Sequence, residues 1–243
     1  MLWPMHRNAV AVAERLGLRP VEDERSTASE PVAERLLSAG LTLAVGAVIV
    51  QTVVHVLNEE LLGAKVLLDA DNDASAFTWL SVVAEAAAAL AVAVYAASGR
   101  IQKHYLVLAG AIAFLSLDDE VALHERLGSF RPDFLGIPED LTNRVVWPAV
   151  YLPILAITFF LLWELSSHAH PSARKWLRIG LGLLVAGIAF EVLTAPLPTT
   201  RDDGWPYTIE TAIEEGVELL GWAVIASATV SIAVARLIGL GRR

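Results

Sequence analysis

Long apolar runs separated by short polar connectors dominate the chain. Six of these runs approach the roughly twenty residues that an α-helix needs to cross a bilayer's hydrocarbon layer. The pattern therefore predicts an all-α fold, an integral membrane bundle of six transmembrane helices. We expect a cytoplasmic N-terminal segment over residues 1–33 and a transmembrane domain over residues 34–240. The six predicted helices cover residues 36–57, 76–98, 104–123, 145–165, 176–195 and 208–238.

Composition supports a membrane protein. Of the 243 residues, 55% are hydrophobic and only 19% are charged, and the mean hydropathy is +0.54. A soluble domain needs more polar side chains to cover its surface. The absence of cysteine excludes disulfides, thiolate metal sites and cysteine nucleophiles. The formal net charge of -9 argues against a nucleic-acid partner, which would require a basic face.

The basic residues predict an orientation for the bundle. If both termini are cytoplasmic, 13 of the 18 Lys and Arg residues fall on the inner side and five on the outer side. Basic residues resist translocation, so this bias favours an N-in, C-in arrangement. We expect a multi-pass protein of the cell inner (plasma) membrane, with the lipid bilayer as its main partner.

Acidic residues sort to the opposite, outer ends of the predicted helices. Asp69, Asp71 and Asp73 precede the second helix, and residues 118–125 end the third. The sixth helix opens with Glu210, Glu214, Glu215 and Glu218, and Glu191 lies late in the fifth. Carboxylates at spacings of four residues stack on one helical stripe and repel each other. Water, shared protons or a bound cation must offset this repulsion, and ionisable groups within spans usually face the bundle interior.

The stretch SLDDEVALHERLG (116–128) is the densest acidic motif. At 100° per residue, Asp118 and Glu125 share one helical face, with His124 at its margin. They could be metal ligands that face Glu214 and Glu218, or they could form a solvated helix end in the headgroup layer.

Three further positions have alternative interpretations. The stretch D-x-D-x-D-x-S from Asp69 to Ser75 has the spacing of oxygen ligands in calcium loops, but Ser75 or Asp73 could equally cap the second helix. His55 and Glu59 are spaced as a ligand pair, although a lone interfacial histidine is the simpler reading. Glu85 lies near the middle of its span, where a charge is costly.

The motifs themselves resemble a family of uncharacterised polytopic bacterial membrane proteins. The resemblance rests on SLDDEVALHERLG, on DADNDASAFTWLS (69–81) and on ETAIEEGVELLGW (210–222). It carries no activity, but it implies that the acidic residues and one histidine act as a set. This set comprises Asp71, Asp73, Asp118, Asp119, His124, Glu125, Glu214, Glu215 and Glu218.

Together, the residues predict a divalent metal site formed by carboxylates and His124 at the outer ends of the helices. This ligand set would suit Zn, Mn, Fe or Ca. The metal could clamp helices together, or it could activate water against a lipid or ester bond as in metal-dependent hydrolases. The alternatives are an ion or proton transporter and a non-catalytic subunit. Small-residue helix faces are compatible with a homo-oligomer or a membrane-complex partner.

Overall fold

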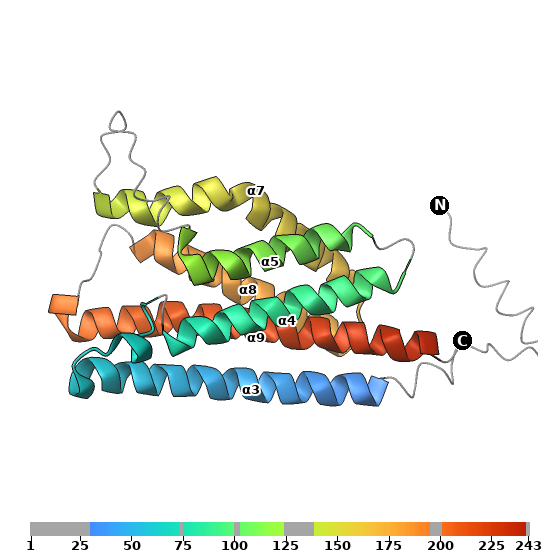
Figure 1. Cartoon of the computed structure of the whole chain (residues 1–243), viewed down its shortest axis with the longest axis horizontal. Helices are drawn as coiled ribbons and strands as arrows, with labels where there is room; N and C mark the ends of the chain where they lie inside the picture. Colours follow the sequence, from blue (N-terminus) through green and yellow to red (C-terminus); the bar gives the residue numbers. More distant parts are fainter. Residues whose placement is uncertain (1–29, 73–74, 100–102, 124–138, 195–200, 242–243) are drawn as a thin grey trace, which may run out of the picture.

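In the described residues, the protein is a bundle of long helices without strands (Figure 1). The computed structural model describes residues 30–72, 75–99, 103–123, 139–194 and 201–241. The all-α prediction is confirmed, and one helix occupies each predicted apolar run. The helices are α3 (Glu30–Leu57), α4 (Ala76–Ala97), α5 (Tyr105–Val121), α7 (Glu139–Ser167), α8 (Pro171–Thr194) and α9 (Trp205–Gly241).

The bundle has the dimensions and the surface of a multi-pass membrane protein. Five of the described helices are long and apolar enough to cross a membrane, whereas α5 is shorter, at 17 residues. Large apolar side chains point outward, including Leu43, Phe160 and Leu193, which are 74%, 66% and 76% exposed. Apolar surface on this scale is unfavourable in water and is normally covered by lipid or a partner.

Five helices form a closed ring, and the sixth lies outside it. Neighbouring pairs in the ring are α4 with α5, α5 with α7, α7 with α8, α8 with α9, and α9 with α4. Helix α3 packs along the outer side of α9 (Figure 1). Helix α9 is thus part of the ring and also contacts α3, so it packs against three long helices.

The ring closes tightly between α8 and α9 because glycine removes side-chain bulk there. A Cβ atom added at Gly221 would lie 2.6 Å from Leu184 Cδ2. One added at Gly180 would lie 2.7 Å from Ile225 Cγ1 and 3.0 Å from the Gly221 carbonyl oxygen. Small residues allow helix backbones to approach in this way, which increases van der Waals contact.

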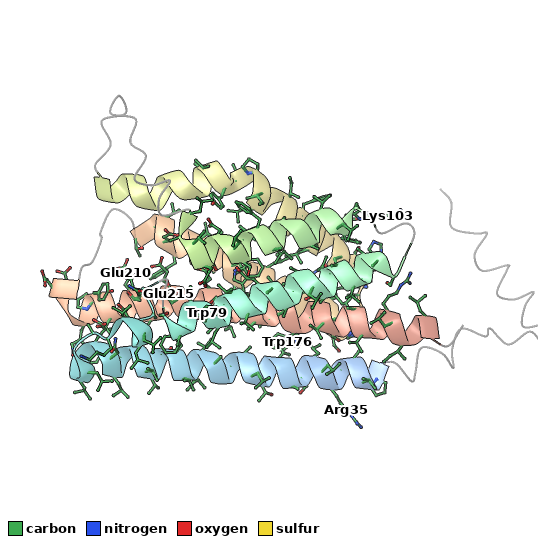
Figure 2. The ribbon with its side chains drawn as sticks, in the orientation of Figure 1. Arg35, Trp79, Lys103, Trp176, Glu210 and Glu215 are labelled. Atoms are coloured by element: carbon green, nitrogen blue, oxygen red, sulfur yellow. The ribbon has the colours of Figure 1, made fainter. Side chains whose placement is uncertain are left out.

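The two ends of the bundle differ in charge. Arg35 and Lys103 lie at one end, and Glu210 and Glu215 lie toward the other (Figure 2). We call these the basic end and the acidic end. The separation matches the sequence pattern, in which basic connectors alternate with acidic ones.

The connector between α3 and α4 folds back over the acidic end. It contains the π-helix η1 (Asn58–Leu62) and the 3-10 helix η2 (Val66–Leu68), and Gly63 turns the chain with a φ of 73°. The Asn58 side chain holds this turn, because it accepts a hydrogen bond from the Lys65 N–H at 2.8 Å and donates one to the Lys65 carbonyl at 3.1 Å.

Candidate metal centre

A cavity of about 440 Å³ lies inside the five-helix ring, and every helix of the ring lines it. Helix α3 contributes none of its lining, but the connector after it contributes Ala70 and Asp71. The helices contribute Thr78, Ser81 and Glu85 from α4; Leu115, Asp118 and Asp119 from α5; Tyr151, Leu155 and Phe159 from α7; Leu184, Gly187, Ile188 and Glu191 from α8; and Glu214, Glu215, Glu218 and Trp222 from α9.

The cavity wall is strongly acidic. Eight of its described lining residues are carboxylates, and none of the others is Lys, Arg or His. This excess of one charge sign at membrane depth is costly unless cations or protons accompany it. The eight residues are Asp71, Glu85, Asp118, Asp119, Glu191, Glu214, Glu215 and Glu218.

Three of these carboxylates meet at one point. One carboxylate oxygen from each of Glu85, Asp119 and Glu218 lies within 4.8 Å of the others. We call these residues the carboxylate triad. They come from α4, α5 and α9, which are far apart in sequence, so helix packing alone brings them together. Oxygen atoms at this separation can surround a single cation, since cation–oxygen distances are about 2.0 to 2.6 Å.

Glu85 is the most buried member of the triad. With a rise of 1.5 Å per residue, it lies roughly 13 Å along α4 from the helix start at Ala76. It is 1% exposed, and its Oε2 atom has no hydrogen-bond partner in the described structure. A buried polar atom without a partner is rare and calls for an explanation, such as an ion at the site.

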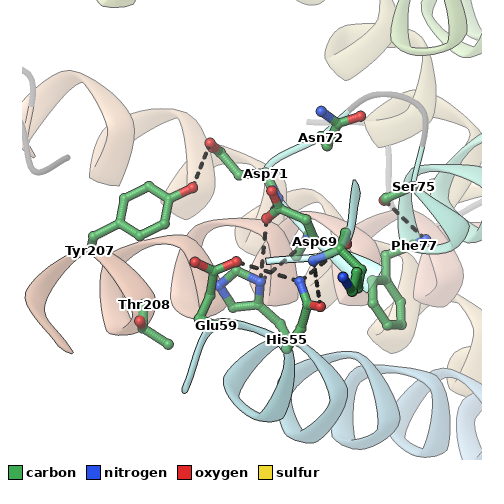
Figure 3. Close-up of polar contacts among 12 residues, drawn as sticks. His55, Glu59, Asp69, Asp71, Asn72, Ser75, Phe77, Tyr207 and Thr208 are labelled. Atoms are coloured by element: carbon green, nitrogen blue, oxygen red, sulfur yellow. Dashed lines mark hydrogen bonds and ion pairs between the residues drawn. The ribbon is translucent and has the colours of Figure 1, made fainter. Parts of the chain in front are cut away.

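Two tyrosines fix neighbouring carboxylates at the cavity. The Tyr151 hydroxyl donates a hydrogen bond to Asp118 Oδ1 at 2.7 Å. The Tyr207 hydroxyl donates one to Asp71 Oδ2 at 2.8 Å (Figure 3). Each bond joins elements distant in sequence and orients the oxygen that accepts it. The second bond also holds the connector at the mouth of the cavity.

Helical periodicity explains why single helices deliver several polar groups. Thr78, Ser81 and Glu85 are spaced by three and four residues, so they share one face of α4. On α9, the same spacing aligns Glu214, Glu218 and Trp222 along the cavity. The i, i+4 acidic stripe predicted from the sequence therefore faces the ring interior at Glu214 and Glu218.

A second, smaller cluster lies outside the ring. Ligand atoms of His55, Glu59 and Asp69 lie within 4.8 Å of one another, and His55 and Asp69 are buried. The His55 Nδ1 atom accepts a hydrogen bond from the Ala70 N–H at 3.1 Å, with Asp69 Oδ1 3.6 Å away (Figure 3). The hydrogen bond from Ala70 ties the connector to the end of α3.

In the aspartate-rich stretch before α4, the described residues Asp69, Asp71 and Ser75 have different neighbours. Asp69 lies beside His55, whereas Asp71 lines the cavity and accepts from Tyr207. Ser75 caps α4, because its Oγ accepts hydrogen bonds from the Phe77 and Thr78 N–H groups, each at 3.1 Å (Figure 3). The predicted cap is therefore present at Ser75, and it is compatible with ligation by the aspartates.

Six of the nine residues predicted as ligands line the cavity: Asp71, Asp118, Asp119, Glu214, Glu215 and Glu218. The other three, Asp73, His124 and Glu125, lie outside the described residues. Helix α5 ends at Val121, and Ala122 adopts a left-handed conformation with a φ of 50°. Glu125, which was predicted to share a helical face with Asp118, lies outside the described residues, so this expectation stays a prediction.

The sequence analysis left four cavity or cavity-mouth residues out of the ligand set. Glu85 and Glu191 were visible as charges within apolar runs, and such charges are the available signal for an intramembrane site. Tyr151 and Tyr207 gave no signal, because an aromatic residue near a span end normally reads as an interfacial anchor. Their roles depend on contacts between helices.

The chain matches a family whose description assigns no activity. No curated protein and no solved structure matches it. The family match spans residues 36–232, which includes all six described long helices in whole or in part and every described residue of the cavity. The chain therefore belongs to the family described as Domain of unknown function (DUF8692).

Proposed function

We propose that this membrane protein binds a divalent cation in the five-helix ring, with Glu85, Asp119 and Glu218 as its protein ligands. The observation that carries the proposal is the meeting of three carboxylates from three helices within 4.8 Å. A cation would offset their mutual repulsion and would satisfy the buried Glu85 oxygen. Asp118, Glu214 and Glu215 would supply further oxygens or hold water on the ion.

The donor set favours a hard cation. All eight ionisable side chains among the described cavity residues offer oxygen, and none offers nitrogen. Carboxylate and water ligands suit Mg²⁺, Ca²⁺ or Mn²⁺, whereas Zn²⁺ in proteins usually takes nitrogen or sulfur ligands as well. Of the metals suggested by the sequence, Mn and Ca fit the described cavity better than Zn.

The role that the geometry supports best is structural. The triad joins α4, α5 and α9, so a cation there would fasten one side of the ring. Transport would require polar groups that continue toward the basic end. Instead, buried apolar residues follow the triad on the same helices, including Val92, Leu108, Ile112 and Ile225. We assign the protein to the bacterial plasma membrane on its basic-residue bias and on its resemblance.

Metal analysis of the detergent-purified full chain tests this proposal. We expect about one Mn²⁺ bound per chain after loading and desalting. Glu85→Gln and Asp119→Asn each remove one anionic ligand, so we expect affinity to fall about tenfold or more. Glu120→Gln is the matched control, because Glu120 neighbours Asp119 but is exposed and does not line the cavity.

The variants must remain folded for the comparison to hold, which size-exclusion chromatography and thermal melting in detergent would check. Equal Mn²⁺ affinity for the wild type, Glu85→Gln and Asp119→Asn would refute the triad as the site. Absence of saturable binding of Mn²⁺ and Ca²⁺ to the wild type would refute the metal itself and would favour carboxylates that share protons.

A further inference from the structure

We infer that the same cavity binds a lipophilic organic cation, with its positive centre at the carboxylate triad and its apolar groups on the opposite wall. This inference rests on the cation-binding character proposed above, but it does not require that a metal be bound. Three properties of the cavity carry it: its size, its distribution of polar and apolar side chains, and its charge.

The cavity is larger than a metal ion needs. A water molecule in the liquid takes about 30 Å³, so an ion with a full shell of six waters would leave much of the 440 Å³ unfilled. Pockets for small organic ligands have volumes of roughly 300 to 1,000 Å³. The cavity therefore has the volume of a ligand pocket.

Polar and apolar side chains occupy different depths of the cavity. On α9, Glu214 and Glu218 come first from the acidic end, and Trp222 follows one turn deeper. On α5, Asp118 and Asp119 lie nearer the acidic end than Leu115. Leu155 and Phe159 on α7 and Leu184 on α8 complete the deep wall, whereas α4 contributes only polar side chains to the cavity. We call Leu115, Leu155, Phe159, Leu184 and Trp222 the apolar floor.

This floor suits an organic group better than it suits water. Apolar cavity walls offer water few hydrogen bonds, so such space is filled favourably by hydrocarbon. The rings of Phe159 and Trp222 can also attract a positive charge through their faces. Both aromatic residues line the same cavity as the carboxylate triad, on the side away from the acidic end. An organic group that contacts them would therefore keep its charge close to Glu85.

Charge decides which organic group fits. A neutral or anionic ligand would leave the eight carboxylates of the cavity without a counter-charge from the described lining residues. A positive centre with apolar substituents suits both walls, and its charge would offset that of the buried Glu85 carboxylate, one oxygen of which has no hydrogen-bond partner in the described structure. A monocation and a divalent metal would then compete for the triad.

Binding of tetraphenylphosphonium to the detergent-purified full chain tests the inference. Triphenylphosphine oxide is the matched neutral probe, because it carries the same aryl groups without the net charge. By isothermal titration calorimetry, we expect the cation to bind at least about tenfold more tightly than the neutral probe. We also expect Mn²⁺ to weaken cation binding by competition if the metal occupies the triad.

Variants separate the cavity from nonspecific partition into detergent. Glu85→Gln and Asp119→Asn should each weaken tetraphenylphosphonium binding about tenfold, and Trp222→Leu should weaken it about fivefold. Glu120→Gln should leave it unchanged. Thermal melting shows whether each variant is folded. Because two triad variants are made, the test still works if one of them fails to fold.

The outcomes distinguish this inference from the metal proposal. Saturable Mn²⁺ binding without tetraphenylphosphonium binding would overturn the organic-cation site and leave the metal site standing. Tetraphenylphosphonium binding that depends on Glu85, without Mn²⁺ binding, would support the organic-cation site and overturn the metal site. Equal binding of the charged and neutral probes, or equal binding by wild type and both triad variants, would also overturn the inference.

Discussion

At the scale of single residues, buried oxygen atoms define the chemistry of this protein. Glu85 is almost fully buried, and one of its carboxylate oxygens has no hydrogen-bond partner. Asp118, which lies in the last turn of α5, accepts a hydrogen bond from the Tyr151 hydroxyl. Carboxylates of the same cavity therefore differ in their surroundings: in the described structure one Glu85 oxygen has no hydrogen-bond partner, whereas Asp118 is oriented by a neighbouring side chain.

Tyr151→Phe tests this orienting role. The substitution removes the donor to Asp118 while keeping the ring, so Asp118 becomes less well positioned beside the triad. We expect Mn²⁺ affinity to fall about tenfold, the lower end of the range for residues that orient metal ligands. Titration of the purified protein with Mn²⁺, followed by calorimetry, measures the change.

Tyr105→Phe is the control for this prediction. Tyr105 is also buried, but its hydroxyl has no hydrogen-bond partner in the described structure, and it does not line the cavity. We expect unchanged Mn²⁺ affinity and equal or slightly higher stability, because a buried unsatisfied hydroxyl is removed. Similar affinity losses in both variants would show that Tyr151 acts only through packing.

At the scale of elements, close contact between α8 and α9 closes the ring around the cavity. Gly180 and Gly221 leave no space for a side chain at this contact, and the cavity residues Leu184 and Trp222 lie beside it along the same two helices. Packing at the glycines thus sets the position of the apolar floor. The Ser75 cap has a comparable role for α4, because it fixes where the helix that carries Glu85 begins.

Gly221→Ala tests the helix contact. The added methyl group would overlap the Leu184 side chain, so α8 and α9 must separate or Leu184 must change rotamer. Overpacking of this kind costs about 1 to 3 kcal/mol, and we expect a lower thermal midpoint in detergent. Gly182→Ala is the matched control on α8, because nothing lies within 4 Å of the added atom.

For Gly182→Ala we expect unchanged or slightly raised stability, because alanine is the better helix former by about 1 kcal/mol in water. An equal drop in midpoint for Gly182→Ala and Gly221→Ala would contradict the proposed contact. It would show that the glycines matter for helix flexibility rather than for the approach of α8 to α9.

At the scale of the whole molecule, charge is divided between the two ends of the bundle. Arg35 and Lys103 lie at the basic end, and Glu210 and Glu215 lie toward the acidic end (Figure 2). Most carboxylates of the cavity lie on its side toward the acidic end. The connector before α4 lines the cavity there with Ala70 and Asp71. With the predicted N-in, C-in orientation, a cation would reach the site from outside the cell.

Single cysteines test this orientation, since the chain contains none of its own. Lys65→Cys and Lys103→Cys introduce exposed thiols on the connectors that flank α4. A membrane-impermeant maleimide should label Lys65→Cys in intact cells, and it should label Lys103→Cys only after lysis. The gel shift of each labelled variant is the measurement.

The reverse pattern would show that the bundle is inverted, because both positions would have exchanged sides. Labelling of both variants in intact cells would show that α4 does not separate the two connectors. Either result would remove the basis for access from outside, although the cavity itself would be unaffected.

The sequence by itself determined the helical elements and their polarity. Hydropathy, run length and charge are properties that add along the chain, so they located all six long helices and gathered the acidic groups at one end. They also placed Glu214 and Glu218 on one stripe of the sixth helix, four residues apart. None of these inferences depends on how one helix is rotated against another.

Only the tertiary structure decided which side chains share a centre. Glu85 lies beside Asp119 and Glu218. Asp69 instead lies beside His55, and Ser75 caps α4. The physical reason is that a contact between two helices depends on their spacing and rotation, which are set by packing such as that at Gly180 and Gly221. The sequence pattern indicates how far along a helix a charged residue lies, but it does not indicate which residue of another helix that side chain contacts.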